Sequence, residues 1–79
     1  MVYTVYILKS EISEKHYIGV TKDLSERLER HNTGRSKWTK KYKPWHIVYT
    51  EEFQDKVEAL KREKQIKSYK GGEAFRKLI

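Results

Sequence analysis

The sequence contains no cysteine and no long apolar run, and each of these two absences excludes a class of protein. Without cysteine there are no disulfide scaffolds and no thiolate zinc sites. No apolar stretch approaches the roughly 20 residues that a membrane-spanning helix needs. A cleavable leader is not recognisable, because Met1 is followed at once by the strand-like residues 2–6. A soluble, cytoplasmic protein with no membrane partner is therefore expected.

Positive charge and aromatic side chains are abundant instead. The chain has 79 residues, with 18 Lys and Arg against 11 Asp and Glu, a net charge of +7, and 13% aromatic residues. A chain of this length predicts one domain, residues 1–79, with few core positions. The excess of positive charge favours a polyanionic partner, most commonly nucleic acid. Charge alone does not tell whether that partner is cut or only bound.

Three runs of aromatic and β-branched residues predict strands, at residues 2–8, 16–21 and 45–50. The polar residues 9–15 suit a hairpin connection between the first two strands. Gly19 weakens the second strand and predicts a bulge or a close approach of another group to the backbone.

Capping residues predict the helices. A helix over residues 24–31 can be capped by Thr21 or Asp23, and Glu26 would complete a capping box with Asp23. Residues 32–34, which include a glycine, end that helix.

The second half of the chain adds a loop and two more helices. Five basic residues, two aromatic residues and no acidic residue between positions 35 and 43 predict a loop closed by Pro44. Asp55 then opens a long helix over residues 56–69, and a pair of glycines separates it from a short helix over residues 73–78. The predicted order is ββαβαα in one α+β unit, and the last twelve residues have no predicted role beyond covering the core.

Glu63 interrupts the apolar stripe that Ala59, Leu60 and Ile66 form on the long helix. A carboxylate placed there is partly desolvated, which costs free energy unless a cation or a hydrogen-bond donor meets it. One interpretation is an ion pair with a nearby Lys or Arg, or a side chain that reaches water. The other is a metal ligand or a catalytic carboxylate.

Arg27 and His31 are one turn apart on the first helix, so both can reach one point. A lone inward-facing histidine is most often a hydrogen-bonded core residue. An arginine one turn earlier favours an anion site, because the guanidinium offers a fixed fork of donors that matches phosphate.

Tyr6 and Tyr17 lie on the first two predicted strands, and in a hairpin their rings can face the same side. Each is most simply a packing residue. As a catalytic base, a tyrosine would need nearby cations to lower its pKa from about 10. No serine has a histidine partner at a recognisable spacing, and no glycine-rich phosphate loop is present.

These residues resemble the paired signature of the GIY-YIG nuclease domain. Thr4-Val5-Tyr6 precedes Tyr17-Ile18-Gly19 by eleven residues, and Arg27 and His31 follow in order. Residues 58–67, around Glu63, are similar to the glutamate helix of the family. The similarity covers residues 2 to about 67 and is to small stand-alone members described as excinuclease-like or endonuclease-like.

The resemblance implies a three-stranded antiparallel sheet flanked by helices and a metal-dependent endonuclease that hydrolyses phosphodiester bonds in DNA, branched or damaged DNA included. It implies that Tyr6 is the general base, helped by His31, and that Tyr17 orients the water or the phosphate. Arg27 stabilises the developing charge, Glu63 holds one Mg²⁺ or Mn²⁺ ion that binds weakly without substrate, and Gly19 lets the backbone approach the site. Charge from this cation cluster is expected to lower the pKa of Tyr6.

Two departures from the family pattern stand out. The first motif reads Thr4-Val5-Tyr6, without its glycine, and no asparagine follows the glutamate helix, where some family nucleases use one. The basic segment 35–43 has two interpretations. One is a solvated basic face with two packing aromatic residues, and the other is a surface that binds the phosphate backbone, with the two aromatic side chains stacking on bases. Its predicted contact residues are Arg35, Lys37, Trp38, Lys40, Lys41, Tyr42 and Lys43.

Two questions about partners stay open at this point. RNA is not excluded as the substrate, and a homodimer or a targeting partner could supply recognition. Strong sequence specificity is not expected, because nothing resembles a base-reading helix. The alternative function is a non-catalytic, basic nucleic-acid-binding module with the same fold.

Overall fold

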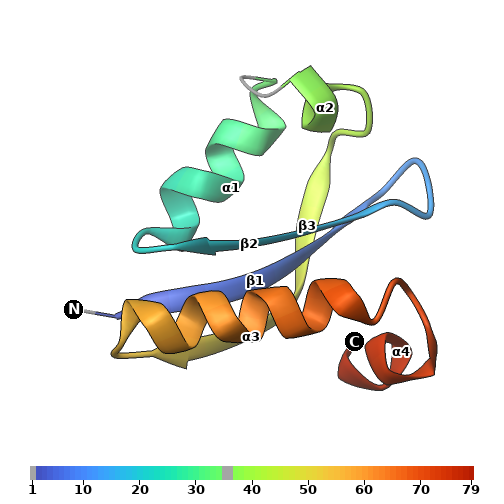
Figure 1. Cartoon of the computed structure of the whole chain (residues 1–79). Helices are drawn as coiled ribbons and strands as arrows, with labels where there is room; N and C mark the ends of the chain where they lie inside the picture. The colour runs from blue at the N-terminus through green and yellow to red at the C-terminus, as the bar shows by residue number, and fades with distance from the viewer. Residues whose placement is uncertain (1, 35–36) are drawn as a thin grey trace.

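A computed structural model describes residues 2–34 and 37–79 of the chain, with seven elements in that part (Figure 1). Two antiparallel strands come first, and a third strand follows after two helices. The elements are β1 (Tyr3–Ser10), β2 (His16–Thr21), α1 (Leu24–Asn32), α2 (Lys37–Lys40), β3 (Trp45–Phe53), α3 (Lys56–Ser68) and α4 (Glu73–Leu78).

The three strands form one antiparallel sheet in the order β2-β1-β3, which confirms the expected fold class. The central strand β1 pairs with β2 in an unbroken register from Thr4↔Thr21 to Lys9↔His16. Its pairing with β3 is interrupted by an irregularity between Ile7 and Leu8.

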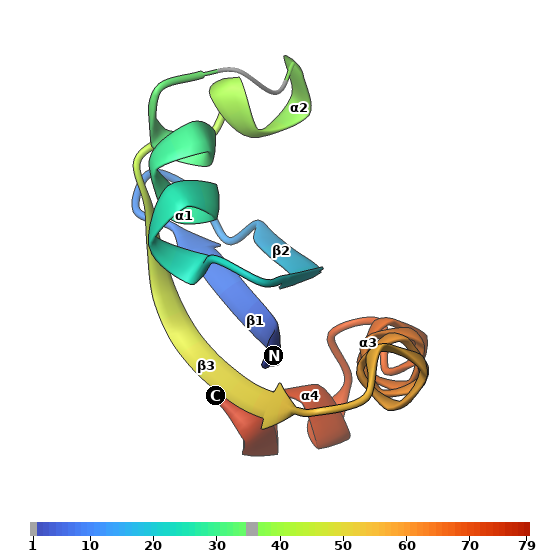
Figure 2. The ribbon, with the colours of Figure 1, turned by 90° about the vertical axis from the view of Figure 1, so that its left-hand side faces the viewer.

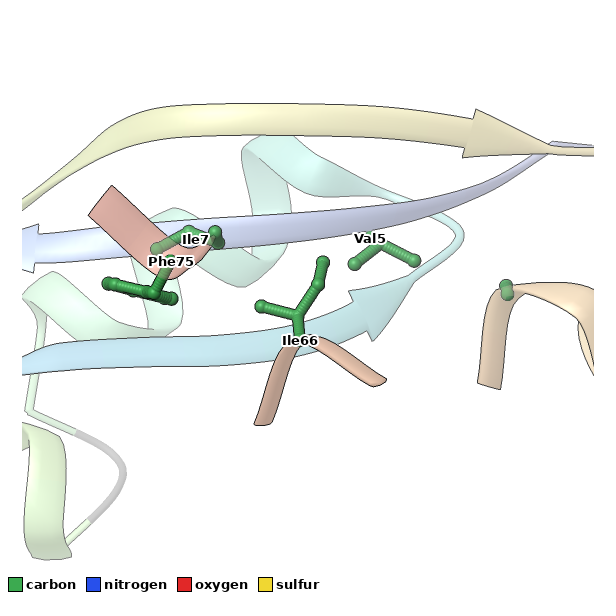
Figure 3. Close-up of a cluster of buried hydrophobic side chains, with 5 residues drawn as sticks. Val5, Ile7, Ile66 and Phe75 are labelled. Carbon is green, nitrogen blue, oxygen red and sulfur yellow. The ribbon is translucent and has the colours of Figure 1, made fainter. Parts of the chain in front are cut away.

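Both faces of β1 are buried, which explains why its sequence is a continuous apolar run and does not alternate. Val5 and Ile7 point to one face, where α3 and α4 cover them with Ala59, Ile66 and Phe75 (Figure 3). The other face carries Tyr6 and Leu8, which cluster with Trp45 and are flanked by α1 and α2. Figures 1 and 2 show α1 and α2 on one side of the sheet and α3 on the other.

The helix starts follow the predicted caps, with one correction. The Asp23 carboxylate accepts a hydrogen bond from the Glu26 backbone N–H at 3.1 Å. The reciprocal half of the predicted capping box is not seen. Glu26 instead accepts a hydrogen bond from Arg30 at 2.8 Å, and the Asp23 N–H donates to Thr21 Oγ1. A cation one turn along the helix is a stronger partner for the carboxylate than a backbone amide.

Two further predictions are wrong in detail. The basic segment before Pro44 was expected to be a loop, but Lys37–Lys40 form the short helix α2. Leu60, expected on the buried stripe of α3, is 44% exposed, whereas Ala59 and Ile66 are fully buried. The buried stripe of α3 is therefore narrower than periodicity suggested.

Candidate active site

Tyr6 lies opposite Gly19 in the β1–β2 pair and is fully buried. A Cβ atom added to Gly19 would lie 2.6 Å from the Tyr6 hydroxyl oxygen and 2.8 Å from Cζ. The regular register shows that Gly19 makes no bulge. It is instead the place where the phenol ring of Tyr6 crosses the neighbouring strand, the close approach that was one of the two predicted reasons for a glycine.

Three rings meet above this glycine. The Tyr6 hydroxyl oxygen lies 3.3 Å from His31 Nε2, within hydrogen-bonding distance. The ring of Tyr17, from β2, lies 6.2 Å from the ring of Tyr6 and 4.4 Å from that of His31. The structure thus brings together, on one face of the sheet, three residues that are far apart in the sequence.

Thr39 completes the histidine's environment, and sequence reasoning missed it. Thr39 is fully buried on α2, with its hydroxyl oxygen 3.2 Å from His31 Nδ1. Its carbonyl oxygen accepts a hydrogen bond from Trp45 Nε1 at 2.8 Å. A threonine in a segment taken for a loop gave no signal, and only the short helix α2 turns it inward.

Asn32 fixes the end of α1 next to His31. Its side-chain amide donates to the Trp45 carbonyl oxygen at 3.1 Å and accepts from the Trp45 N–H at 2.6 Å. Two bonds to one residue determine both position and orientation, so α1 is tied to the start of β3 at the residue after His31.

Arg27 is half-buried on the same helix, one turn before His31. Its Nε atom is buried and has no hydrogen-bond acceptor among the described residues. A buried, unpaired guanidinium N–H is costly. It is well suited to receive an anionic oxygen from a ligand.

Glu63 comes from α3, which packs against β1 and β2. Its side chain is 20% exposed and pairs with Lys67 at 3.5 Å. The ion pair that one interpretation of the sequence required is therefore present. The negative charge of Glu63 makes a minor contribution to the raised pKa of Tyr6.

A second ion pair sets the rotation of α3. Arg62 donates from Nε to the Glu51 carboxylate on β3 at 3.1 Å, and Tyr49 donates to the same carboxylate oxygen. Because Arg62 precedes Glu63, this contact helps to fix the direction in which Glu63 leaves the helix.

The protonation states of the pair at the centre differ from expectation. Burial raises the pKa of Tyr6 well above 10, with a further contribution from Tyr17, and the lowering effect of Arg27 is smaller. The prediction that the cations lower this pKa is therefore wrong for the protein alone, because desolvation outweighs them. Burial, together with Arg27 and Arg30, lowers the pKa of His31 below 6.5. At neutral pH the pair consists of a phenol and a neutral imidazole.

The residues present fit a weakly bound, hard divalent ion. No group of three or more His, Asp or Glu side chains that could hold a metal is found within residues 2–34 and 37–79. Glu63 would be the single protein carboxylate, a donor set that suits Mg²⁺, which keeps most of its water ligands and takes others from substrate phosphate.

The predicted nucleic-acid contacts are only partly described. Arg35 lies outside the described residues, as does the side chain of Lys37. Trp38 is 44% exposed and stacks at 5.8 Å on Trp45, so one of its faces is used within the protein. Its ring also lies 6.2 Å from Tyr17, which joins the aromatic cluster to the site. Three lysines of this segment are exposed: Lys40, Lys41 and Lys43.

The sheet, its flanking helices and the cluster around Tyr6 define a class of protein. The family model of the GIY-YIG catalytic domain matches residues 2–74, and the chain belongs to this family. GIY-YIG domains have a nuclease-type fold, generally act on nucleic acid and typically use a divalent metal.

Its relatives are small stand-alone GIY-YIG proteins named UPF0213. Those from several strains of Staphylococcus aureus are 47% identical over 66 residues, which cover 82% of this chain and 79% of the relative. The solution NMR structure of a UPF0213 protein from Bacillus halodurans is 33% identical, with a TM-score of 0.53, and the match covers 86% of this chain and 72% of that one. Within residues 2–34 and 37–79, none of the helices has the length and hydropathy of a membrane span.

Proposed function

We propose that this protein is a metal-dependent endonuclease that hydrolyses phosphodiester bonds in DNA. The observation that carries the proposal is the placement of the Tyr6 hydroxyl between Gly19 and His31 Nε2, where the positive charge of Arg27 also acts on it. A proton acceptor next to a cation that can bind an anionic oxygen is what in-line hydrolysis of a phosphodiester requires.

The hydrogen bonds around His31 define a route for one proton. With His31 neutral, Nδ1–H donates to Thr39 Oγ1 and Nε2 accepts from the Tyr6 hydroxyl. Transfer of the phenolic proton to Nε2 leaves a phenolate that can take a proton from the attacking water. Tyr17, which packs on the His31 ring, borders the space where that water would lie.

Arg27 and Glu63 help to neutralise the negative charge of the phosphate, Arg27 directly and Glu63 through a divalent ion. The guanidinium of Arg27 binds the non-bridging oxygens more strongly as negative charge develops in the transition state. Glu63 would hold the divalent ion, which when bound supplies positive charge that polarises the phosphodiester and lowers the pKa of nearby groups. The raised pKa of Tyr6 means that Tyr6 is a phenol at neutral pH in the protein alone.

The test compares two site variants with matched controls. Glu63→Gln is paired with Glu58→Gln, an exposed carboxylate of α3, and Arg27→Ala is paired with Arg76→Ala, an exposed arginine of α4. Plasmid, single-stranded and branched DNA, and an RNA of the same sequence, are incubated with each protein in Mg²⁺ or Mn²⁺. Binding at low salt is measured in parallel.

We expect the wild type and both controls to nick DNA, with all activity lost on chelation. Arg27→Ala should lower the rate by about 10²- to 10³-fold, the usual effect of removing one donor to a developing oxyanion. Glu63→Gln should abolish metal-dependent cleavage and retain binding. Binding by every protein without cleavage under any metal condition would instead identify the non-catalytic module, and cleavage of RNA alone would overturn the assignment of DNA.

A further inference from the structure

A groove opens beside Arg27, and the proposed mechanism assigns no function to this groove. It has a volume of about 380 Å³ and lies where the end of β2, the start of α1 and the start of α3 meet. Figure 2 shows α1 and α3 on either side of the tip of β2. A volume of this size falls within the range of small-molecule sites in proteins.

The groove has an apolar floor. Tyr3 and Val20, both half-buried on the sheet, line it together with Leu60 of α3. Leu60 is 44% exposed, although the spacing of α3 predicted a core position. Its exposure is explained if it faces a ligand, since large apolar groups around a groove commonly mark a binding surface.

The rim of the groove is cationic. Lys22, Arg27 and Lys56 all line it, and Lys22 lies over the Tyr3 ring at 5.5 Å. Asp23 and Glu26 also line it, but Asp23 caps α1 and Glu26 pairs with Arg30. The cations are therefore the charges left to meet a ligand, which must be anionic at its edge and apolar at its centre.

The groove is continuous with the site through both helices. Arg27 belongs to the groove and to the site, and Leu60 precedes Glu63 by three residues on α3. Lys56 is seven residues before Glu63, about 10 Å along the helix axis at 1.5 Å per residue. Phosphates spaced by about 3.4 Å of rise per nucleotide in a duplex, and further apart in an extended strand, can span that length.

We infer that this groove is the subsite for the nucleotide next to the scissile phosphate. Its base and sugar lie on Tyr3, Val20 and Leu60, and its outer phosphate lies between Lys22 and Lys56. This inference rests on the proposed function, because it takes the phosphate at Arg27 to be the one that is cut. The groove then holds the substrate strand along the free edge of β2.

The first test removes the two lysines and counts phosphate contacts. Lys22→Gln/Lys56→Gln is compared with Lys15→Gln/Lys77→Gln, which removes the same charge from the hairpin and from α4. Both pairs are made in Glu63→Gln protein, which does not cut. Binding of a single-stranded oligonucleotide of about 12 nucleotides, within the range that single-strand sites cover, is measured against salt concentration.

Affinity falls as salt rises, and each lost phosphate contact reduces the magnitude of the negative slope of log affinity against log salt by about 0.7 for a single strand. We expect a decrease of about 1.4 for the groove pair and a clearly smaller one for the control pair. Equal decreases would show only a general effect of charge and would overturn the subsite.

The second test locates the base. Oligonucleotides that lack one base at successive positions are bound to Leu60→Ser protein and to Val57→Ser protein, in the same Glu63→Gln background. Val57 is 56% exposed on α3 and does not line the groove, so it is a matched control. Removing the base next to the cut should weaken binding about tenfold in the Val57→Ser protein, the scale of one stacked base, and should have little further effect in Leu60→Ser.

The two proposals fail in different ways. Cleavage by the wild type, with groove variants that behave like their controls, leaves the nuclease standing and refutes the subsite. Groove effects without any cleavage by the wild type support a nucleotide site in the groove and refute hydrolysis.

Discussion

Gly19→Ala should disrupt the centre of the site with one methyl group. The added Cβ would lie 2.6 Å from the Tyr6 hydroxyl oxygen, 2.8 Å from Tyr6 Cζ and 3.1 Å from Tyr17 Cε1. Tyr6 is fully buried and its hydroxyl contacts His31, so the ring has no free space to move into. The new methyl group must push the phenol away from the imidazole or separate β1 from β2.

The expected magnitude follows from two opposing effects. Overpacking a buried site costs about 1–3 kcal/mol of unfolding free energy. Replacing a glycine whose backbone suits any residue returns about 0.4–1 kcal/mol by restricting the unfolded chain. The net loss is about 1–2 kcal/mol, which lowers the Tm of a domain this small by about 5–15 °C. Cleavage should fall further, by about 10²-fold, because a reacting group is displaced by about 1 Å.

Tyr6→Phe provides the control for this prediction. It removes the hydroxyl that the methyl group would meet at 2.6 Å and leaves the contacts with Cζ at 2.8 Å and with Tyr17 Cε1 at 3.1 Å. In a double-mutant cycle, thermal unfolding of Gly19→Ala/Tyr6→Phe should show less destabilisation than the sum of the single variants. A Gly19→Ala protein as stable and as active as the wild type would refute the steric account of this glycine.

Two further predictions concern α1 and its histidine. Asn32→Ala removes both hydrogen bonds to Trp45 and should cost about 2 kcal/mol in urea unfolding, at about 1 kcal/mol for each bond. Asn32→Asp, which keeps only the acceptor, should lose less, and equal losses would contradict the two-bond account. Burial lowers the folded-state pKa of both His31 and His16 below the ordinary 6.5. The unfolded chain therefore binds more protons as the pH falls below 6.5, and the unfolding free energy should decrease from there down to the folded-state pKa. Urea midpoints that rise as the pH falls through this interval would show that the pKa shifts have the opposite sign.

Much of the fold could be predicted because local signals agreed with it. β2 and α4 have the predicted bounds, and Asp55 caps α3 by accepting from the Val57 N–H. β3 continues to Phe53, three residues further than expected. Its last residues, Glu51 and Glu52, are poor strand formers, and pairing with β1 keeps them extended.

The site was harder to predict, because its contacts join residues that are distant in the sequence. No local sequence pattern shows which residues will meet. Arg27 and His31 share a helix face, so their proximity followed from spacing alone. Thr39 and Asn32 act through contacts with residues 8 and 13 positions away, and neither residue type marked them. The pKa of Tyr6 was mispredicted for a related reason. Counting cations in the sequence identified the positively charged neighbours of Tyr6 but not the burial of its ring. Burial has the largest effect on the pKa of Tyr6.

The central strand β1 serves the core with Val5 and Ile7 and the face of the candidate site with Tyr6. Side chains alternate across a strand, so slipping β1 by one position would present an aliphatic side chain to His31 and bury the phenol under α3. The register in which β1 pairs with its neighbours therefore determines both the hydrophobic packing and the position of Tyr6 in the candidate site. An inserted or deleted residue within β1 would abolish both at once, so this segment should tolerate substitution far better than a change of length.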